Sequence, residues 1–364
     1  MRPADATRFH QTVGALTAAA AYFFGTGLSG LWPLVWIAPI PVLVLSYRSS
    51  ARRSAAIAFV AYVVGSLNIA SYLVRLAPPP AVIAALLVPA LAFTLAVLMQ
   101  RYAILQGKGW TGVLAFPAAW TSYEFLLSLM APDGTALNLA YSQAGALPLV
   151  QLASLTGIWG ISFLVTLVPA GMAAAWHWRG QRRLALVALG VPICLGLMAW
   201  GYGWVRLAGS TPASTLRVGA ATSDESIHLF DASTREQALP VLEAYARRID
   251  ELARRGAQVV VLPEKFVGVA PDYEEEAIRV LSESSRRNRV TVVAGLNRIG
   301  RVPKHNTAFV FGPDGQLLIE YEKAFLLPGF ESGYNRGLSP GIFSAAGATY
   351  PPGELPLAIL PMMR

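Results

Sequence analysis

Two segments in the second half of the chain carry side chains that can do chemistry. Glu264 comes directly after the apolar run 259–262, and Lys323 and Glu331 follow a later strand-like stretch. A carboxylate placed after a buried strand can accept a proton as a general base. An ammonium group beside carboxylates can stabilise the negative charge that develops on a reacting oxygen. Each segment taken alone also fits a solvated surface residue or hairpin end.

These segments lie in a region where strands and helices alternate. Apolar spacing predicts helices over 234–255 and 272–287. Strands are predicted over the segments 216–221, 258–262, 290–296, 307–311 and 316–320, with a hairpin turn at 312–315. The alternation favours a largely parallel sheet with right-handed crossovers, and such sheets bind ligands at the carboxyl ends of their strands. The carboxylate of Glu264 is expected at such an end.

The composition of the first half indicates a membrane protein. Of the 364 residues, 54% are hydrophobic and 14% are charged, whereas a soluble domain carries about 25% charged residues. Residues 1–208 hold 12 Lys+Arg and 3 Asp+Glu, and residues 209–364 hold 17 and 18. We therefore predict a membrane bundle over 1–208 followed by an α/β domain over 209–364. The scattered basic residues argue against a nucleic-acid-binding surface.

The first half contains seven apolar stretches long enough to be membrane spans. They cover residues 11–28, 31–47, 54–74, 81–105, 110–129, 149–176 and 184–205. Basic residues gather on alternate connections, so the positive-inside rule places the N-terminus in the cytoplasm. Seven spans then place the second half on the opposite face, which in a bacterial inner membrane is the periplasm.

Three features of the predicted spans are candidates for a specific role. Glu124 lies in the middle of one span, where a carboxylate is costly and is either functional or paired with a polar neighbour. Gly157 and Gly160 flank Trp159 with a spacing that permits close helix packing. Cys194, the one cysteine of the chain, has apolar neighbours, which makes an inert buried thiol the favoured interpretation.

The motifs of both halves together resemble one family. Leu262-Pro263-Glu264, the segment His305-Asn306-Thr307-Ala308 and the segment 321–331 are similar to the glutamate, hairpin and lysine motifs of the nitrilase, or carbon–nitrogen hydrolase, superfamily. Trp120 to Glu124 and the segment 141–163 resemble membrane spans of its apolipoprotein N-acyltransferase family. The resemblance covers nearly the whole chain.

The resemblance implies a fold, a reaction and roles for residues. The fold is a multi-span helical membrane bundle followed by an α-β-β-α sandwich. The reaction moves an acyl chain from a phospholipid to the N-terminal cysteine amine of an apolipoprotein through a Glu-Lys-Cys thioester mechanism. Glu264 is then the general base, Lys323 stabilises the oxyanion and the thiolate, Glu331 is an accessory carboxylate, and Trp159 belongs to the lipid-side scaffold. No cofactor is implied, and a monomer is expected.

The sequence departs from the family at the nucleophile. The strand that carries the family's cysteine corresponds to the segment 355–360, where Leu360 takes the cysteine position. We therefore expect a sandwich that is incomplete at its C-terminal end, and a chain of these 364 residues that is inactive. Pro328-Gly329-Phe330-Glu331 also differs from the Pro-Phe-Gly-Glu common in family acyltransferases. These departures bear on the substrate and on present activity rather than on the superfamily.

Three alternatives stay open at this level. The first is a membrane-anchored amidase or nitrilase that acts on a small amide, although an anchor needs only one span. The second is a transporter with a soluble appendage, for which more ionisable residues inside the spans are expected. The third is a non-catalytic remnant that binds lipid.

Overall fold

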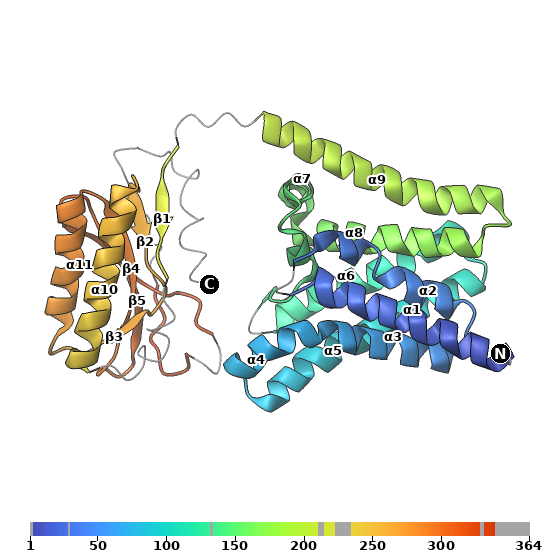
Figure 1. Cartoon of the computed structure of the whole chain (residues 1–364), viewed down its shortest axis with the longest axis horizontal. Helices are drawn as coiled ribbons and strands as arrows, with labels where there is room; N and C mark the ends of the chain where they lie inside the picture. The colour runs from blue at the N-terminus through green and yellow to red at the C-terminus, as the bar shows by residue number, and fades with distance from the viewer. Residues whose placement is uncertain are drawn as a thin grey trace. The chain divides into compact units, whose positions relative to one another are not determined.

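The computed structural model describes residues 3–27, 30–131, 134–209, 215–222, 234–327 and 331–338. The chain divides into two compact units, residues 1–211 and 212–364. Figure 1 shows the first unit as a bundle of helices and the second as a sheet with helices beside it. The strand proposed for the segment 355–360, with Leu360, lies outside the described residues.

Helices make up the first unit, and each range in which a membrane span is expected contains one or more helical elements. Its elements are α1 (Pro3–Gly25), η1 (Trp32–Trp36), α2 (Pro39–Ser46), α3 (Ala51–Ser66), η2 (Leu67–Ile69), α4 (Ala70–Leu76), α5 (Pro79–Leu105), η3 (Gly109–Leu114), α6 (Ala115–Met130), η4 (Leu139–Gln143), α7 (Leu147–Val150), α8 (Ala153–His177) and α9 (Arg182–Ala208).

Within the described part of the chain, five helical segments are long and apolar enough to cross a membrane. They are Ala51–Arg75, Pro79–Leu105, Gly109–Met130, Ala153–His177 and Arg182–Ala208. The helical segment Trp32–Ser46 is shorter. Many large apolar side chains on these helices are exposed, such as those of Leu91, Leu129 and Met198. An exposed apolar surface of this kind suits contact with lipid.

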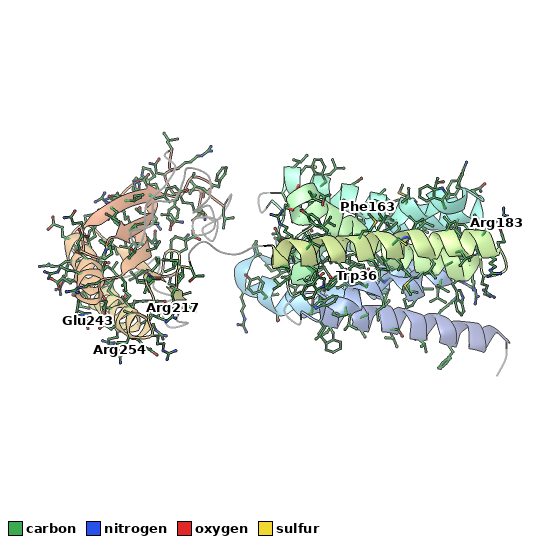
Figure 2. The ribbon with its side chains drawn as sticks, turned by 90° about the horizontal axis from the view of Figure 1, so that it is seen from above. Trp36, Phe163, Arg183, Arg217, Glu243 and Arg254 are labelled. Atoms are coloured by element: carbon green, nitrogen blue, oxygen red, sulfur yellow. The ribbon has the colours of Figure 1, made fainter. Side chains whose placement is uncertain are left out.

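The helix α8 lies at the centre of the bundle. It contacts α2, α6 and α9, and it is the most buried of the five long helices. A side chain at Gly171 would meet the backbone oxygen of Ala188 at 2.2 Å, so α8 and α9 approach closely at that point. Arg183 lies at the end of the bundle where these two helices are joined (Figure 2).

A backbone break divides the start of α8 from the rest. Gly157 has φ +62° and ψ −167°, outside the helical region, in a conformation that glycine adopts readily. The span expected over 149–176 is therefore α7, a connection and a helix that becomes regular only after Gly157. Gly157 therefore marks a break in the helix.

The second unit is a mixed sheet with two helices. Its elements are β1 (Val218–Ala220), α10 (Arg235–Arg254), β2 (Val259–Val261), β3 (Val267–Val269), α11 (Glu274–Asn288), β4 (Thr291–Arg298), β5 (His305–Phe311) and β6 (Leu317–Glu322). The strand order is β1-β2-β4-β5-β6, and β3 pairs with β4. The first three strands of this order are parallel, whereas β4, β5 and β6 are antiparallel.

The expectation of a largely parallel sheet is thus correct only for its first part. The connection from β4 to β5 covers residues 299–304. Parallel neighbours need a crossover of about a dozen residues or more, so such a short connection returns β5 antiparallel to β4. The short strand β3 also follows Glu264 closely, in a segment for which no strand is predicted from the sequence.

The helices α10 and α11 cover one face of the sheet (Figure 1). Their apolar residues form a core with the strands, including Leu242, Ile249, Leu281 and Phe309. Glu243 and Arg254 of α10 are exposed and point away from the sheet (Figure 2). The other face carries a smaller cluster around Val259, Val293 and Val310.

Candidate active site

The first functional side chain, Glu264, follows the carboxyl end of β2. The backbone N–H of Leu262 donates to Val293 of β4, and the N–H of Phe266 donates to Gly295 of β4. A side chain at Gly295 would lie 2.7 Å from the Cα of Glu264. Only glycine therefore lets the glutamate segment lie this close to β4.

Lys323 comes directly after β6 and reaches across to the same place. Its backbone N–H donates to the carbonyl of Asn306 on β5, at 2.9 Å. Its Nζ lies 2.9 Å from Glu264 Oε1 and 2.9 Å from Glu331 Oε2, and its side chain is 4% exposed. Burial disfavours the charge of Lys323, but the two carboxylates outweigh this effect and raise its pKa.

Asn306 holds the two carboxylates together. Its Nδ2 donates to Glu264 Oε1 at 2.6 Å and to Glu331 Oε1 at 2.9 Å. The residue is buried, so both amide hydrogens are used where water is excluded. An asparagine amide offers two donors, which suits a bridge between two carboxylates.

Glu331 is the most enclosed member of the group. Its side chain is fully buried, and its Oε2 accepts from the backbone N–H of Leu327 at 2.9 Å. Burial alone would raise the pKa of Glu331. The backbone donor and the side chains of Lys265 and Lys323 outweigh this effect and lower the pKa to about 2. Glu331 is therefore a fixed anion at neutral pH.

The four side chains form a buried network in which the carboxylates differ in role. Glu331 has no exposed side-chain surface, whereas the side chain of Glu264 is 26% exposed. The more accessible carboxylate of Glu264 suits proton exchange with a substrate. Lys323, ionised and fixed by both carboxylates, presents a preorganised positive charge.

The structure thus brings together Glu264, Lys323 and Glu331, the three site residues predicted from the sequence, from segments up to 67 positions apart in the chain. It also adds two that were not assigned a role, Asn306 and Lys265. Asn306 stands in the segment whose resemblance was noted only as a hairpin. The available signal was an amide side chain near the start of the largely apolar strand β5.

In the first unit, Glu124 is buried and pairs with backbone. Its Oε1 accepts from the N–H of Leu139 at 2.7 Å, at the start of η4. Asn138, next to it, accepts from the Ser162 hydroxyl at 3.0 Å. Glu124 therefore joins α6 to the 134–152 connection, in agreement with the interpretation of a carboxylate paired with a polar neighbour.

Trp159 lines a cavity of about 420 Å³ together with residues of α6, namely Thr121, Ser122, Phe125 and Leu126. The ring of Trp159 contacts Phe125, with 5.4 Å between the ring centres. Cys194 lies on α9 and is exposed on the bundle surface, so the expectation of a buried thiol is wrong. The apolar neighbours of Cys194 are explained if the outer side chains of α9 face lipid, because an exposed thiol then lies in apolar surroundings.

Comparison with known proteins identifies both units. Residues 14–171 match the family model "Apolipoprotein N-acyltransferase N-terminal domain", and residues 226–362 match the model "Carbon-nitrogen hydrolase". Over both units the chain is thus similar to the apolipoprotein N-acyltransferase family. The two matches occur in the order of the two units and cover most of the chain.

Individual relatives agree with this family. An apolipoprotein N-acyltransferase of Geobacter metallireducens is 25% identical over 319 residues, which are 82% of this chain and 60% of the relative. The corresponding protein of Bradyrhizobium diazoefficiens is 27% identical over 62% of this chain and 44% of its own length. The chain thus spans about half of the length of these relatives.

Shorter parts of the chain also resemble amidases. An omega-amidase of Danio rerio is 37% identical over 93 residues, 21% of this chain and 32% of that protein. Among solved structures, an amidase from Nesterenkonia sp. AN1 superposes with a TM-score of 0.32 and 17% identity, over 36% of this chain and 54% of the amidase.

Proposed function

We propose that the protein transfers an acyl chain from a phospholipid to the N-terminal cysteine amine of apolipoproteins. Glu264 is the general base, Lys323 stabilises the oxyanion and a thiolate nucleophile, and Glu331 is the accessory carboxylate. The observation that carries the proposal is the buried ammonium of Lys323, which joins Glu264 and Glu331 at 2.9 Å each in a chain whose other unit is built for a membrane.

The chemistry takes two steps on one carbonyl group. In the first, Glu264 takes the thiol proton, the thiolate attacks the phospholipid ester, and the proton passes to the leaving alcohol of the lysophospholipid. In the second, the acceptor amine attacks the thioester. Glu264 then takes the amine proton and returns it to the departing thiolate, which leaves an amide and the free thiol. Lys323 faces the negative oxygen in both steps.

The thiol is the part that these residues do not bring to the site. The one cysteine, Cys194, belongs to α9 of the helical unit. We propose that a chain of these 364 residues alone forms no acyl-enzyme, while Glu264 and Lys323 keep the arrangement that serves one. Expression of the 364 residues in a bacterium depleted of its own N-acyltransferase should leave the lipoproteins without an N-acyl group.

A lipid substrate accounts for the membrane unit. A phospholipid donor enters from the bilayer, and the cavity lined by Trp159 and Phe125 has the apolar wall that an acyl chain needs. We further propose that the helical unit lies in the bacterial inner membrane with its basic connections in the cytoplasm, that the α/β unit lies in the periplasm, and that the protein is a monomer.

The proposal is tested with protein purified from detergent-solubilised membranes of its host. It is incubated with a phospholipid that carries a labelled acyl chain and with a synthetic diacylglyceryl-cysteine peptide. Transfer of label to the peptide amine is expected, and Glu264→Gln should abolish it. Peptide that stays unlabelled with wild-type protein would refute acyl transfer.

The second candidate is a carbon–nitrogen hydrolase that acts on a small amide. The local similarity of the second unit to an omega-amidase favours it, as does Pro328-Gly329-Phe330-Glu331. Release of ammonia from small amides in the same preparation, without acyl transfer, would support this candidate. The absence of both reactions would leave a non-catalytic remnant.

A further inference from the structure

Lysine is rare in this chain and is concentrated at the site. The sequence has 25 arginines and 4 lysines, and three of the lysines, at positions 265, 304 and 323, lie around the carboxylates or the adjoining Tyr334. Lys323 has a role in the proposed function. Lys265, which directly follows the general base, has none so far.

Lys265 completes the pairing of Glu331. Its Nζ lies 2.9 Å from Glu331 Oε1, while the Nζ of Lys323 lies 2.9 Å from Glu331 Oε2. Glu331 is thus held by an ammonium group at each oxygen. The side chain of Lys265 is 19% exposed and that of Glu331 is fully buried, so this ion pair is largely shielded from water.

The charges of the site balance only when Lys265 is counted. Glu264 and Glu331 supply two negative charges, and Lys265 and Lys323 supply two positive ones. Without Lys265, a single buried ammonium would serve two carboxylates that are bridged by one asparagine amide. One carboxylate would then favour a proton, because adjacent like charges in a buried site resist joint ionisation.

The backbone of Lys265 has an unusual conformation. Its φ is +47°, in the left-handed region that non-glycine residues seldom adopt. Its Nζ also lies 4.8 Å from the centre of the Tyr334 ring, within the range of a cation–π contact. Strained residues that persist beside a reacting group point to a functional constraint.

We propose that Lys265 is a positioning residue that neutralises Glu331, so that the charge of Lys323 stays committed to Glu264 and to the substrate oxygen. The effect on the substrate oxygen rests on the proposed function. The pairing of Lys265 with Glu331 is a property of the folded protein and does not depend on that function. The two parts are tested separately.

The expected titration of Glu331 takes account of each group among the described residues that contacts it or its partners. They are Lys265 and Glu264 after β2, Asn306 on β5, Lys323 after β6 and the N–H of Leu327. Behind them, Lys304 faces the Tyr334 ring at 5.8 Å, and His305 pairs with Glu322. Within the part of the chain that the structure describes, Lys265 and Lys323 are the two cations in contact with Glu331, and together with the N–H of Leu327 they hold the pKa of Glu331 low.

The first test follows the titration of Glu331 by carboxylate-selective ¹³C NMR on the full chain in detergent micelles. The signal is assigned by its loss in Glu331→Gln. Lys265→Met should raise the titration midpoint of Glu331 by about one unit or more, the usual effect of an opposite charge in contact. Lys265→Arg should keep the midpoint near that of the wild type. Lys304→Met, which removes a lysine from the same tyrosine ring, is the matched control and should leave it unchanged.

A second variant controls for misfolding of Lys265→Met. Lys265→Asn has a side chain that tolerates a left-handed φ but is too short to reach Glu331, and it should give the same upward shift as Lys265→Met. A midpoint within about 0.3 units of the wild type in both variants, far below the shift expected for a contact ion pair, would overturn the proposal.

The second test concerns catalysis. In host-purified protein, Lys265→Met should lower kcat of acyl transfer more than it raises KM. It should also move the acid limb of the pH–rate profile to higher pH, and Lys265→Arg should restore both. An unchanged profile with the NMR shift present would limit Lys265 to charge pairing and refute its catalytic part. If no acyl transfer exists at all, the NMR result still decides the pairing.

Discussion

Replacement of Lys323 by methionine should destabilise the second unit in a way that depends on pH. The side chain is 4% exposed and contacts both Glu264 and Glu331. Its removal leaves the pair of bridged carboxylates with Lys265 alone. Loss of one partner of a buried ion pair costs about 3–5 kcal/mol.

Protonation of one carboxylate limits the part of this cost that comes from the uncompensated charge. Taking up a proton at pH 7 from an ordinary pKa of 4.5 costs about 3 kcal/mol, at 1.36 kcal/mol per unit. The variant should therefore be less stable than the wild type by about 3 kcal/mol at pH 7, and by under about 1 kcal/mol at pH 5. The variant gains stability as the pH falls, because one carboxylate has a higher pKa in the folded variant than in the unfolded chain. The wild type stays nearly constant over this range, because the pKa of Glu331 is about 2.

The measurement is hydrogen exchange of the β4 and β5 amides in urea, on the full chain in detergent. Fluorescence would report on the wrong unit, because all nine tryptophans lie between Trp32 and Trp204. The double variant Lys323→Met/Glu331→Gln removes one carboxylate as well and should recover part of the loss at pH 7. A cost below about 1 kcal/mol at pH 7, or one that is the same at pH 7 and pH 5, would refute the charge balance described above.

Three further predictions concern the elements around the site and in the bundle. Gly295→Ala should displace Glu264 and destabilise the second unit by about 1–3 kcal/mol, as overpacking does. The same hydrogen-exchange experiment measures this loss. The control is Gly190→Ala, a position with nothing within 4 Å, and it should have little effect. Glu124→Ala should lower the stability of the bundle by about 1–3 kcal/mol, because the N–H of Leu139 loses its acceptor, whereas Glu124→Gln keeps an acceptor oxygen; thermal melting in detergent compares the two, and equal losses would contradict this role. A reporter enzyme active only in the periplasm should be active when fused within the second unit, and activity of a cytoplasmic reporter at the same point would reverse the proposed orientation.

The meeting of Glu264 and Lys323 was predicted from the resemblance of their segments to the glutamate and lysine motifs of the nitrilase superfamily. Their positions after strands, where α/β sheets bind ligands, also fitted surface residues. Asn306 and Lys265 were not predicted, since nothing in a lone asparagine or lysine tells which carboxylate it will contact. Those contacts depend on the register of β4 with β5 and on the left-handed backbone at Lys265.

Some features of the fold were likewise predictable from the sequence, and others were not. The helix ranges follow from apolar periodicity and capping, as at Thr234 before α10, whose capping box is formed. The direction of β5 depends on the length of the connection before it, and β3 is only three residues long. The partner of Glu124 was also out of reach, because it is a backbone N–H in a connection 15 residues further along the chain.

The central claim is that Glu264 and Lys323 serve acyl transfer to lipoproteins. It is tested most directly by the mass of the N-terminal peptides of lipoproteins isolated from the host. Strains in which the gene for this chain carries Glu264→Gln or Lys323→Met should yield peptides that lack the mass of one acyl chain, while Lys304→Met leaves the mass unchanged. Fully acylated peptides in both site variants would contradict the account.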